Sequence, residues 1–159
     1  MQIKSYFIII ATFIFGFVLS AVPLPDTISN WRPSLVPLIL IYWCMALPNR
    51  FGIKSAWFLG MVFDVQKSFV LGQHAIGFIF LAYIILKNHK RIRVYPLPQQ
   101  AFIVFIYLLI YKSIMLLIMF LSGSVLHTWS YWMPIVTSVL LWPFLFLGMR
   151  YFRRRYNIS

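Results

Sequence analysis

Six apolar segments, separated by short polar or proline-containing stretches, constrain this chain more than any other feature. They cover residues 6–22, 34–47, 55–71, 72–86, 99–122 and 133–152. A helix needs about 20 apolar residues to cross a bilayer core, or somewhat fewer where the bilayer thins. Because 62% of the 159 residues are hydrophobic, against roughly 45–50% in soluble domains, a water-soluble fold could not bury them. The sequence therefore predicts an all-α integral membrane protein, folded as a single bundle of six transmembrane helices over residues 1–159.

The distribution of basic residues predicts the direction of these spans. When the N-terminus is placed in the cytoplasm, only Arg32 and Lys67 fall in outer connections, and Lys112 falls within the fifth span. All other Lys and Arg residues then lie on the cytoplasmic side, as the positive-inside rule requires. We therefore expect six spans, a retained first span that is longer than a signal peptide, and both termini in the cytoplasm. The same pattern accounts for the net charge of +12 and leaves no continuous basic face for nucleic acid.

A basic tail ends the chain at residues 150–159. Its arginines are Arg150, Arg153, Arg154 and Arg155. Two roles stay open for this tail. It binds anionic phospholipid at the cytoplasmic membrane surface, where each charge contributes about 1 kcal/mol, or it docks a cytoskeletal partner.

Groups that would support catalysis or metal binding are sparse. Asp26 and Asp64 are the only carboxylate side chains, and they lie in an outer loop and in the membrane, respectively. The histidines fall in separate loop or boundary regions, where we interpret each as an interfacial polar residue: His74, His89 and His127. The single cysteine, Cys44, excludes an intramolecular disulfide. We therefore predict no enzymatic activity, no metal and no cofactor.

Two charged residues inside predicted spans need an explanation, because an Asp or Lys there costs about 2.5–3.5 kcal/mol. Asp64 and Lys112 lie near the middle of spans that run in opposite directions, so they reach similar depths. Three interpretations are open. The two residues form an ion pair or a shared polar network that fixes packing; or Lys112 reaches towards the membrane surface while Asp64 bonds Ser, Gln or backbone groups near a broken helix; or Asp64 serves proton- or ion-coupled transport.

Small residues and prolines mark the places where helices meet or bend. Gly52, Ala56 and Gly60 recur every four residues and form a small stripe on the third span. Such a stripe fits either an internal helix crossing or the transmembrane helix of a partner. We expect Pro48 to end the second span and Pro143 to bend the sixth.

Three stretches, in this order, resemble the bacterial rod-shape-determining family MreD: RPSLVPLILIYWCMALPNR at 32–50, GMVFDVQKSFVLGQHAIG at 60–77 and LWPFLFLGMR at 141–150. The resemblance extends over essentially the whole chain. The matching positions are Arg32, Pro33, Tyr42, Trp43, Leu47, Pro48, Arg50, Gly60, Asp64, Leu71, Gly72, Trp142, Pro143 and Arg150. Family members tend to have small Ser or Gly residues between the aspartate and the Leu-Gly pair, whereas this chain has Lys67, Ser68, Phe69 and Val70 there.

The resemblance implies a multi-pass protein of the bacterial cytoplasmic membrane that maintains rod shape as a non-catalytic scaffold. Its implied partners are the bitopic periplasmic protein MreC, the actin-like MreB, and the glycosyltransferase and transpeptidase that build lateral peptidoglycan in the elongation complex. Arg32 and Pro33 then either cap the outer end of the second span and contact headgroups, or contact MreC.

The family fold is also similar to the six-helix substrate-binding S components of vitamin transporters. Binding or transport of a small molecule or a lipid-linked precursor is therefore the alternative function. A scaffold predicts packed helices and a partner interface, whereas a binding protein predicts a cavity with several converging polar groups.

Overall fold

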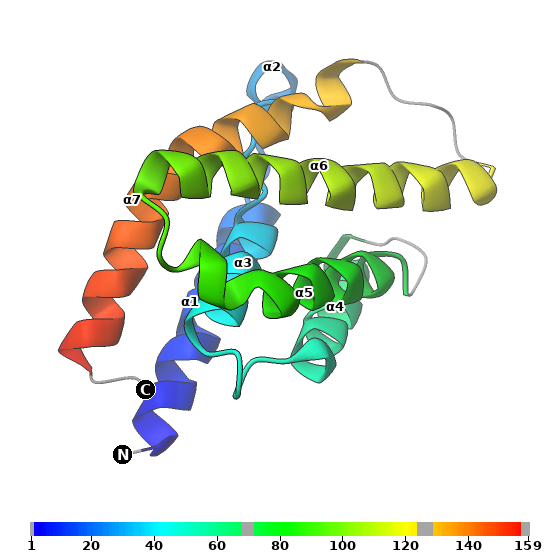
Figure 1. The fold of residues 1–159 in the computed structure, drawn as a ribbon. Helices are drawn as coiled ribbons and strands as arrows, with labels where there is room; N and C mark the ends of the chain where they lie inside the picture. The colour runs from blue at the N-terminus through cyan, green and yellow to red at the C-terminus, as the bar shows by residue number, and fades with distance from the viewer. Residues whose placement is uncertain (1, 68–71, 124–128, 157–159) are drawn as a thin grey trace.

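The computed structural model describes residues 2–67, 72–123 and 129–156, with side chains from Tyr6 onward. All regular secondary structure in these ranges is helical, which confirms the all-α prediction (Figure 1). Within the same ranges, six longer helices follow the six apolar segments, and two short helices lie in connections. The elements are α1 (Gln2–Ala21), α2 (Asp26–Ser29), α3 (Leu35–Ala46), α4 (Ile53–Lys67), α5 (Gln73–Ile92), α6 (Leu97–Leu121), η1 (Trp129–Tyr131) and α7 (Met133–Arg155).

Two stretches of the described chain are long and apolar enough to cross a membrane on their own. They are α6 and the stretch Trp129–Arg155, which joins η1 to α7. Shorter apolar helices cover Tyr6–Ala21 and Leu35–Ala46. These helices agree with a membrane protein, and the six-span bundle with both termini in the cytoplasm stays a prediction.

The helices α5 and α7 continue past the ends of their apolar segments. α5 extends beyond Leu86 to Ile92, and α7 extends beyond Phe152 to Arg155. Lys and Arg are good helix formers, and cations in a last turn interact favourably with the negative end of the helix dipole. The first part of the basic tail is therefore helical and belongs to the last turns of α7.

The central helix of the fold is α3. It contacts α1, α5 and α7, and every residue from Val36 to Ala46 is buried. Its sequence is apolar on all sides, which is typical of a helix surrounded by other helices. Pro37 is tolerated because it lies in the first turn, and Pro48 comes just after the helix ends. The shortest of the six apolar segments thus forms the middle of the core.

A close helix crossing brings α4 against α5, which in turn packs against α3. Ala56 and Gly60 of α4 are buried, and a Cβ at Gly60 would lie 2.3 Å from the Ala75 Cα. Only glycine permits this approach of the two backbones. Gly52 precedes α4, and a Cβ there would meet nothing within 4 Å. The small stripe therefore serves an internal crossing at its Gly60 end, and Gly52 takes no part in it.

The last two long helices cover this core. α6 crosses over α5 and meets α7 (Figure 1). Figure 1 also shows α7 changing direction along its length, and Pro143 lies inside this helix next to the fully buried Trp142. A proline inside a helix removes one backbone hydrogen bond, so a bend is expected there.

Candidate functional site

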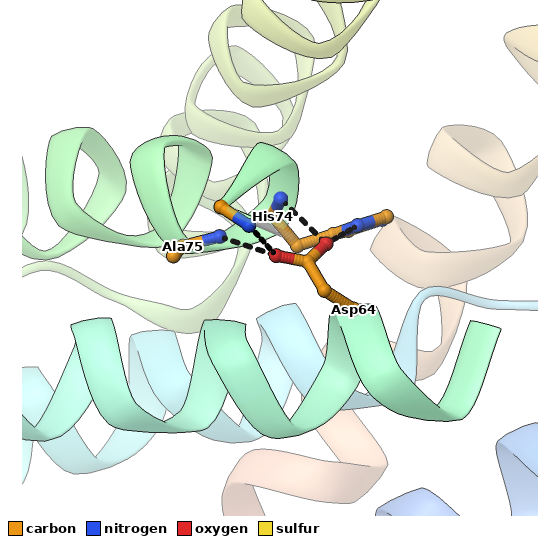
Figure 2. A network of polar contacts seen from close by, with 4 residues as sticks. Asp64, His74 and Ala75 are labelled. Carbon is orange, nitrogen blue, oxygen red and sulfur yellow. Dashed lines mark hydrogen bonds and ion pairs between the residues drawn. The ribbon is translucent and has the colours of Figure 1, made fainter. Parts of the chain in front are cut away.

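A polar network joins the end of α4 to the beginning of α5. The Asp64 side chain is fully buried and projects from α4 towards the first turn of α5 (Figure 2). Its Oδ2 accepts hydrogen bonds from the backbone N–H groups of Gly72 (2.9 Å) and Ala75 (3.4 Å). Its Oδ1 accepts the His74 N–H at 2.9 Å and lies 2.7 Å from the His74 Nδ1. The carboxylate therefore caps a helix other than its own.

The N-terminus of α5 requires such a cap from outside. Its N-cap residue is Gly72, which has no side chain and has a left-handed backbone with a φ of 99° that favours glycine. The first N–H groups of a helix have no partner within the helix, and the positive end of the helix dipole favours an anion there. Asp64 meets both requirements, so its burial is compensated by hydrogen bonds.

His74 belongs to this network. Its side chain is buried, and its ring packs edge-on against Phe63 with a centroid distance of 4.8 Å. His74 thus lies at a segment boundary, as predicted, with its side chain buried against Asp64, and its interfacial depth stays a prediction. The sequence contains one signal for this contact. His74 follows Gly72 at the start of a predicted helix and comes ten residues after Asp64. His89 lies near the end of α5, and His127 lies outside the described residues.

Lys112 does not pair with Asp64. In the part of the chain that the structure describes, the ion-pair contact of Asp64 is with His74. The Lys112 ammonium group lies over the Tyr131 ring, 4.3 Å from its centroid, and the Tyr131 hydroxyl donates to the Lys112 carbonyl at 3.0 Å. Of the three interpretations of these charges, the geometry favours bonding of Asp64 to backbone groups at a helix break. The ion pair is not formed because the N–H groups of α5 already satisfy the carboxylate.

The C-terminal end of α1 is held by three side chains from other parts of the chain. Arg32 donates to two of its carbonyls, and Gln66 and Lys67 of α4 each donate to one more. The accepting residues are Phe17, Leu19, Ser20 and Val22. Carbonyls at a helix C-terminus lack partners within the helix, and cations are favourable there. Arg32 therefore caps α1, and the expectation that it caps the second span is wrong.

These polar groups border a cavity of about 300 Å³, here called the outer cavity. Arg32, Lys67 and Lys112 supply its positive charge, and Pro33 and Phe63 are among its apolar lining. A second cavity of about 250 Å³ shares His74, Tyr111 and Lys112 with it. Neither Asp26 nor Asp64 lines either cavity. The two cavities therefore present hydrogen-bond donors and positive charge to an incoming group. In the predicted topology both cavities lie on the periplasmic side.

Several other predicted positions lie in the core. Trp43 is buried, and its Nε1 donates to the Thr12 Oγ1 at 2.9 Å, which links α3 to α1. Tyr42 and Trp142 are also buried. Arg50 lies in the turn that follows α3. Leu71, together with residues 68–70, lies outside the described residues.

The basic residues of α7 separate into two sets. Arg150 and Arg153 line a cavity at the opposite end of the bundle, whereas Arg154 and Arg155 are exposed outside it and share a shallow surface hollow with Arg150. In the ranges with described placement, no group of three or more His, Cys, Asp or Glu side chains is arranged to hold a metal ion.

Comparisons with known proteins place this chain in a family. The family described as rod shape-determining protein MreD matches residues 1–152. The chain is similar to the curated rod shape-determining protein MreD of Haemophilus influenzae, with 31% identity over 156 residues, which cover 98% of this chain and 96% of that protein. No solved structure matches the chain. These matches support a role in rod shape determination. The chain therefore belongs to the MreD family of rod shape-determining proteins.

Proposed function

We propose that the chain is a non-catalytic scaffold of the bacterial inner membrane, which maintains rod shape by linking MreC and MreB to lateral peptidoglycan synthesis. Family membership over nearly the whole chain supports the role in cell shape. The observation that carries the non-catalytic part is the environment of Asp64, because both carboxylate oxygens accept hydrogen bonds from α5. A carboxylate that holds two helices together is not available as a general acid or base.

The outer cavity is the surface that we assign to MreC. In the predicted topology it faces the periplasm, and Arg32 and Pro33 line it. Its positive charge and apolar walls fit a peptide segment that combines apolar side chains with carbonyl or acidic groups. MreB and the glycosyltransferase and transpeptidase of the elongation complex are the further partners of this proposal.

A second candidate function is the binding of a small molecule or a lipid-linked precursor. The same cavity favours it, because polar groups from α4, α5 and α6 converge there. The volume of about 300 Å³ lies at the lower end of the roughly 300–1,000 Å³ that small-molecule sites occupy. Arg32 and Lys67 already donate to α1, however, which fits a shaped docking surface better than a dedicated ligand site.

A bulky substitution at the cavity rim tests the scaffold proposal. Ser29 is exposed and lines the outer cavity, so Ser29→Trp places an indole where MreC would dock. The matched control is Ser122→Trp, because Ser122 is exposed at the end of α6 and lines none of the cavities described above. We expect MreC recovery in mild detergent to fall about tenfold for Ser29→Trp, a loss of roughly 1.4 kcal/mol, and to be unchanged for Ser122→Trp.

The outcome of this comparison separates the two functions. Equal recovery of MreC with both variants would overturn the assignment of MreC to the outer cavity. Depletion of the chain that rounds rod-shaped cells without changing solute uptake supports the scaffold. Depletion that abolishes uptake of a solute while cells stay rod-shaped supports the binding function instead.

A further inference from the structure

A second basic cavity lies at the other end of the bundle, between α3, the start of α6 and the last turns of α7. Its volume is about 350 Å³. Arg93 from the α5–α6 connection lines it, together with Arg150 and Arg153 of α7. Figure 1 shows this connection running alongside α7, and α6 and α7 are in contact. Residues far apart in the sequence thus bring three guanidinium groups to one place, here called the inner cavity.

The floor of the inner cavity contains a hydroxyl group that has no partner. Tyr42 of α3 is 1% exposed and lines the cavity, and its hydroxyl makes no hydrogen bond with the described residues. The ring is held by edge-to-face contacts with Trp43 and Phe146, at centroid distances of 5.4 Å and 5.7 Å. Buried hydroxyls normally have a partner, so this donor is available to a ligand. Arg93, Arg150 and Arg153 line the same cavity as this hydroxyl.

The first turn of α6 borders the same cavity. Pro96 and Leu97 line it, and α6 begins there without a side-chain cap. The side-chain amide of Gln100 donates to the carbonyls of Ile92 and Tyr95, which fixes the α5–α6 connection around the cavity. The N-terminus of a 25-residue helix is the positive end of the helix dipole, which favours an anion.

No carboxylate side chain of this chain lies among these donors. The two aspartates are elsewhere, since Asp64 caps α5 and Asp26 begins α2. A phosphate group is the anion that fits best, because its oxygens accept several hydrogen bonds at once and pair with the planar guanidinium fork.

The surroundings of the cavity favour a phosphate that carries acyl chains over a free one. Val94 lines the cavity with 83% of its surface exposed, and Leu147, one turn before Arg150 on α7, is also exposed. Apolar side chains beside a basic pocket match the boundary between the lipid tails and the headgroups on the predicted cytoplasmic face.

We propose that the inner cavity binds the phosphate headgroup of an anionic phospholipid, held by Arg93, Arg150 and Arg153 and by the Tyr42 hydroxyl. The site goes beyond the scaffold function and does not depend on the outer cavity. It also differs from a general attraction of basic residues to an anionic surface, because it requires particular side chains.

Titration of the purified full-length chain with short-chain phosphatidylglycerol in zwitterionic detergent tests this site, with bound lipid measured by native mass spectrometry. Arg150→Gln with Arg153→Gln removes two phosphate contacts, and we expect the Kd to rise about tenfold or more. The charge-matched control is Arg154→Gln with Arg155→Gln, which lies on the same helix outside the cavity. We expect this control to change the Kd by less than about twofold, as for exposed contacts.

Tyr42→Phe keeps the ring and removes only the hydroxyl, so it separates binding from folding. We expect it to raise the Kd about two- to tenfold with an unchanged helical circular dichroism spectrum and unchanged recovery of MreC. Equal weakening by the two double variants would overturn the proposal in favour of general surface attraction. Competition by inorganic phosphate at the same concentration as the lipid, or equal affinity for short-chain phosphatidylcholine, would overturn the assignment to an anionic lipid.

Discussion

A single carboxylate shows how this fold accommodates charge inside a predicted span. An Asp at the centre of a membrane helix costs about 2.5–3.5 kcal/mol. Hydrogen bonds to charged groups contribute about 1.5–3 kcal/mol each, and Asp64 accepts them from Gly72, His74 and Ala75. The donors are N–H groups at a helix start, which would otherwise lack partners. The buried charge and the unpaired helix end therefore compensate each other.

Asp64→Asn tests this balance with little change in shape. One carboxylate oxygen becomes an NH₂ group, which faces backbone N–H donors and leaves at least one of them without an acceptor. We expect the free energy of unfolding to fall by about 2–4 kcal/mol, measured by thermal or denaturant unfolding in detergent. Asp26→Asn is the control, because Asp26 is exposed in α2 and should change stability by less than about 0.5 kcal/mol. Equal stability of the two variants would contradict the capping role.

The sequence alone identifies Asp64 as exceptional but not its partners. Lys112 matches Asp64 in predicted depth, so the sequence favours a pair of these two residues. The actual donors are backbone groups and a histidine that becomes buried only when α5 folds back along α4. Every residue except proline has a backbone N–H group, so the residue types do not reveal which N–H groups will bond Asp64. Gly72 matters because its left-handed backbone conformation positions these N–H groups.

The crossing of α4 and α5 depends on a small residue that lets the two backbones come close together. α4 and α5 cross at Gly60, where hydrogen in place of a side chain lets the Ala75 backbone come near. Association of helices in lipid relies on van der Waals contact at small residues, because lipid tails are as apolar as the side chains. The same crossing brings Asp64 within reach of the α5 N-terminus.

Gly60→Ala should separate these two helices. The new Cβ would lie 2.3 Å from a backbone carbon, which cannot move without shifting α5. We expect a loss of about 1–3 kcal/mol in the free energy of unfolding, as for other overpacked sites. Gly148→Ala in α7 is the matched control, because its Cβ would meet nothing within 4 Å and stability should be unchanged or slightly raised. If Gly60→Ala were as stable as Gly148→Ala, the crossing of α4 and α5 would not require glycine at position 60.

The positions of the long helices follow from hydropathy, whereas their roles in the core do not. Hydropathy measures how apolar a segment is, and both lipid and protein interior are apolar. α3 and α6 therefore look alike in sequence, although α3 is buried from Val36 to Ala46 and α6 has exposed residues such as Phe102 and Leu117. Hydropathy also places the ends of α5 and α7 too early, because basic residues that end an apolar segment still favour a helix.

At the scale of the whole molecule, two basic cavities lie at opposite ends of one packed core. The outer cavity contains Lys67 and Lys112, and the inner cavity contains Arg150 and Arg153. Because the chain has 14 Lys and Arg residues and only two Asp and no Glu, both ends attract anions, and the sidedness of the membrane decides which anions each end meets. The functions proposed for the two cavities therefore depend on the same orientation.

Thiol labelling in spheroplasts tests that orientation. Asn30→Cys follows α2 and Gln99→Cys lies in the first turn of α6, and both positions are exposed. We expect a membrane-impermeant maleimide to label Asn30→Cys in intact spheroplasts and Gln99→Cys only after permeabilisation. Cys44 is 0% exposed, so the unsubstituted chain should stay unlabelled in both conditions and serves as the control. Labelling of both variants from outside would mean that the chain crosses the membrane an even number of times between them, so that α3, α4 or α5 does not span. Labelling of Gln99→Cys alone from outside would mean that the bundle has the opposite orientation.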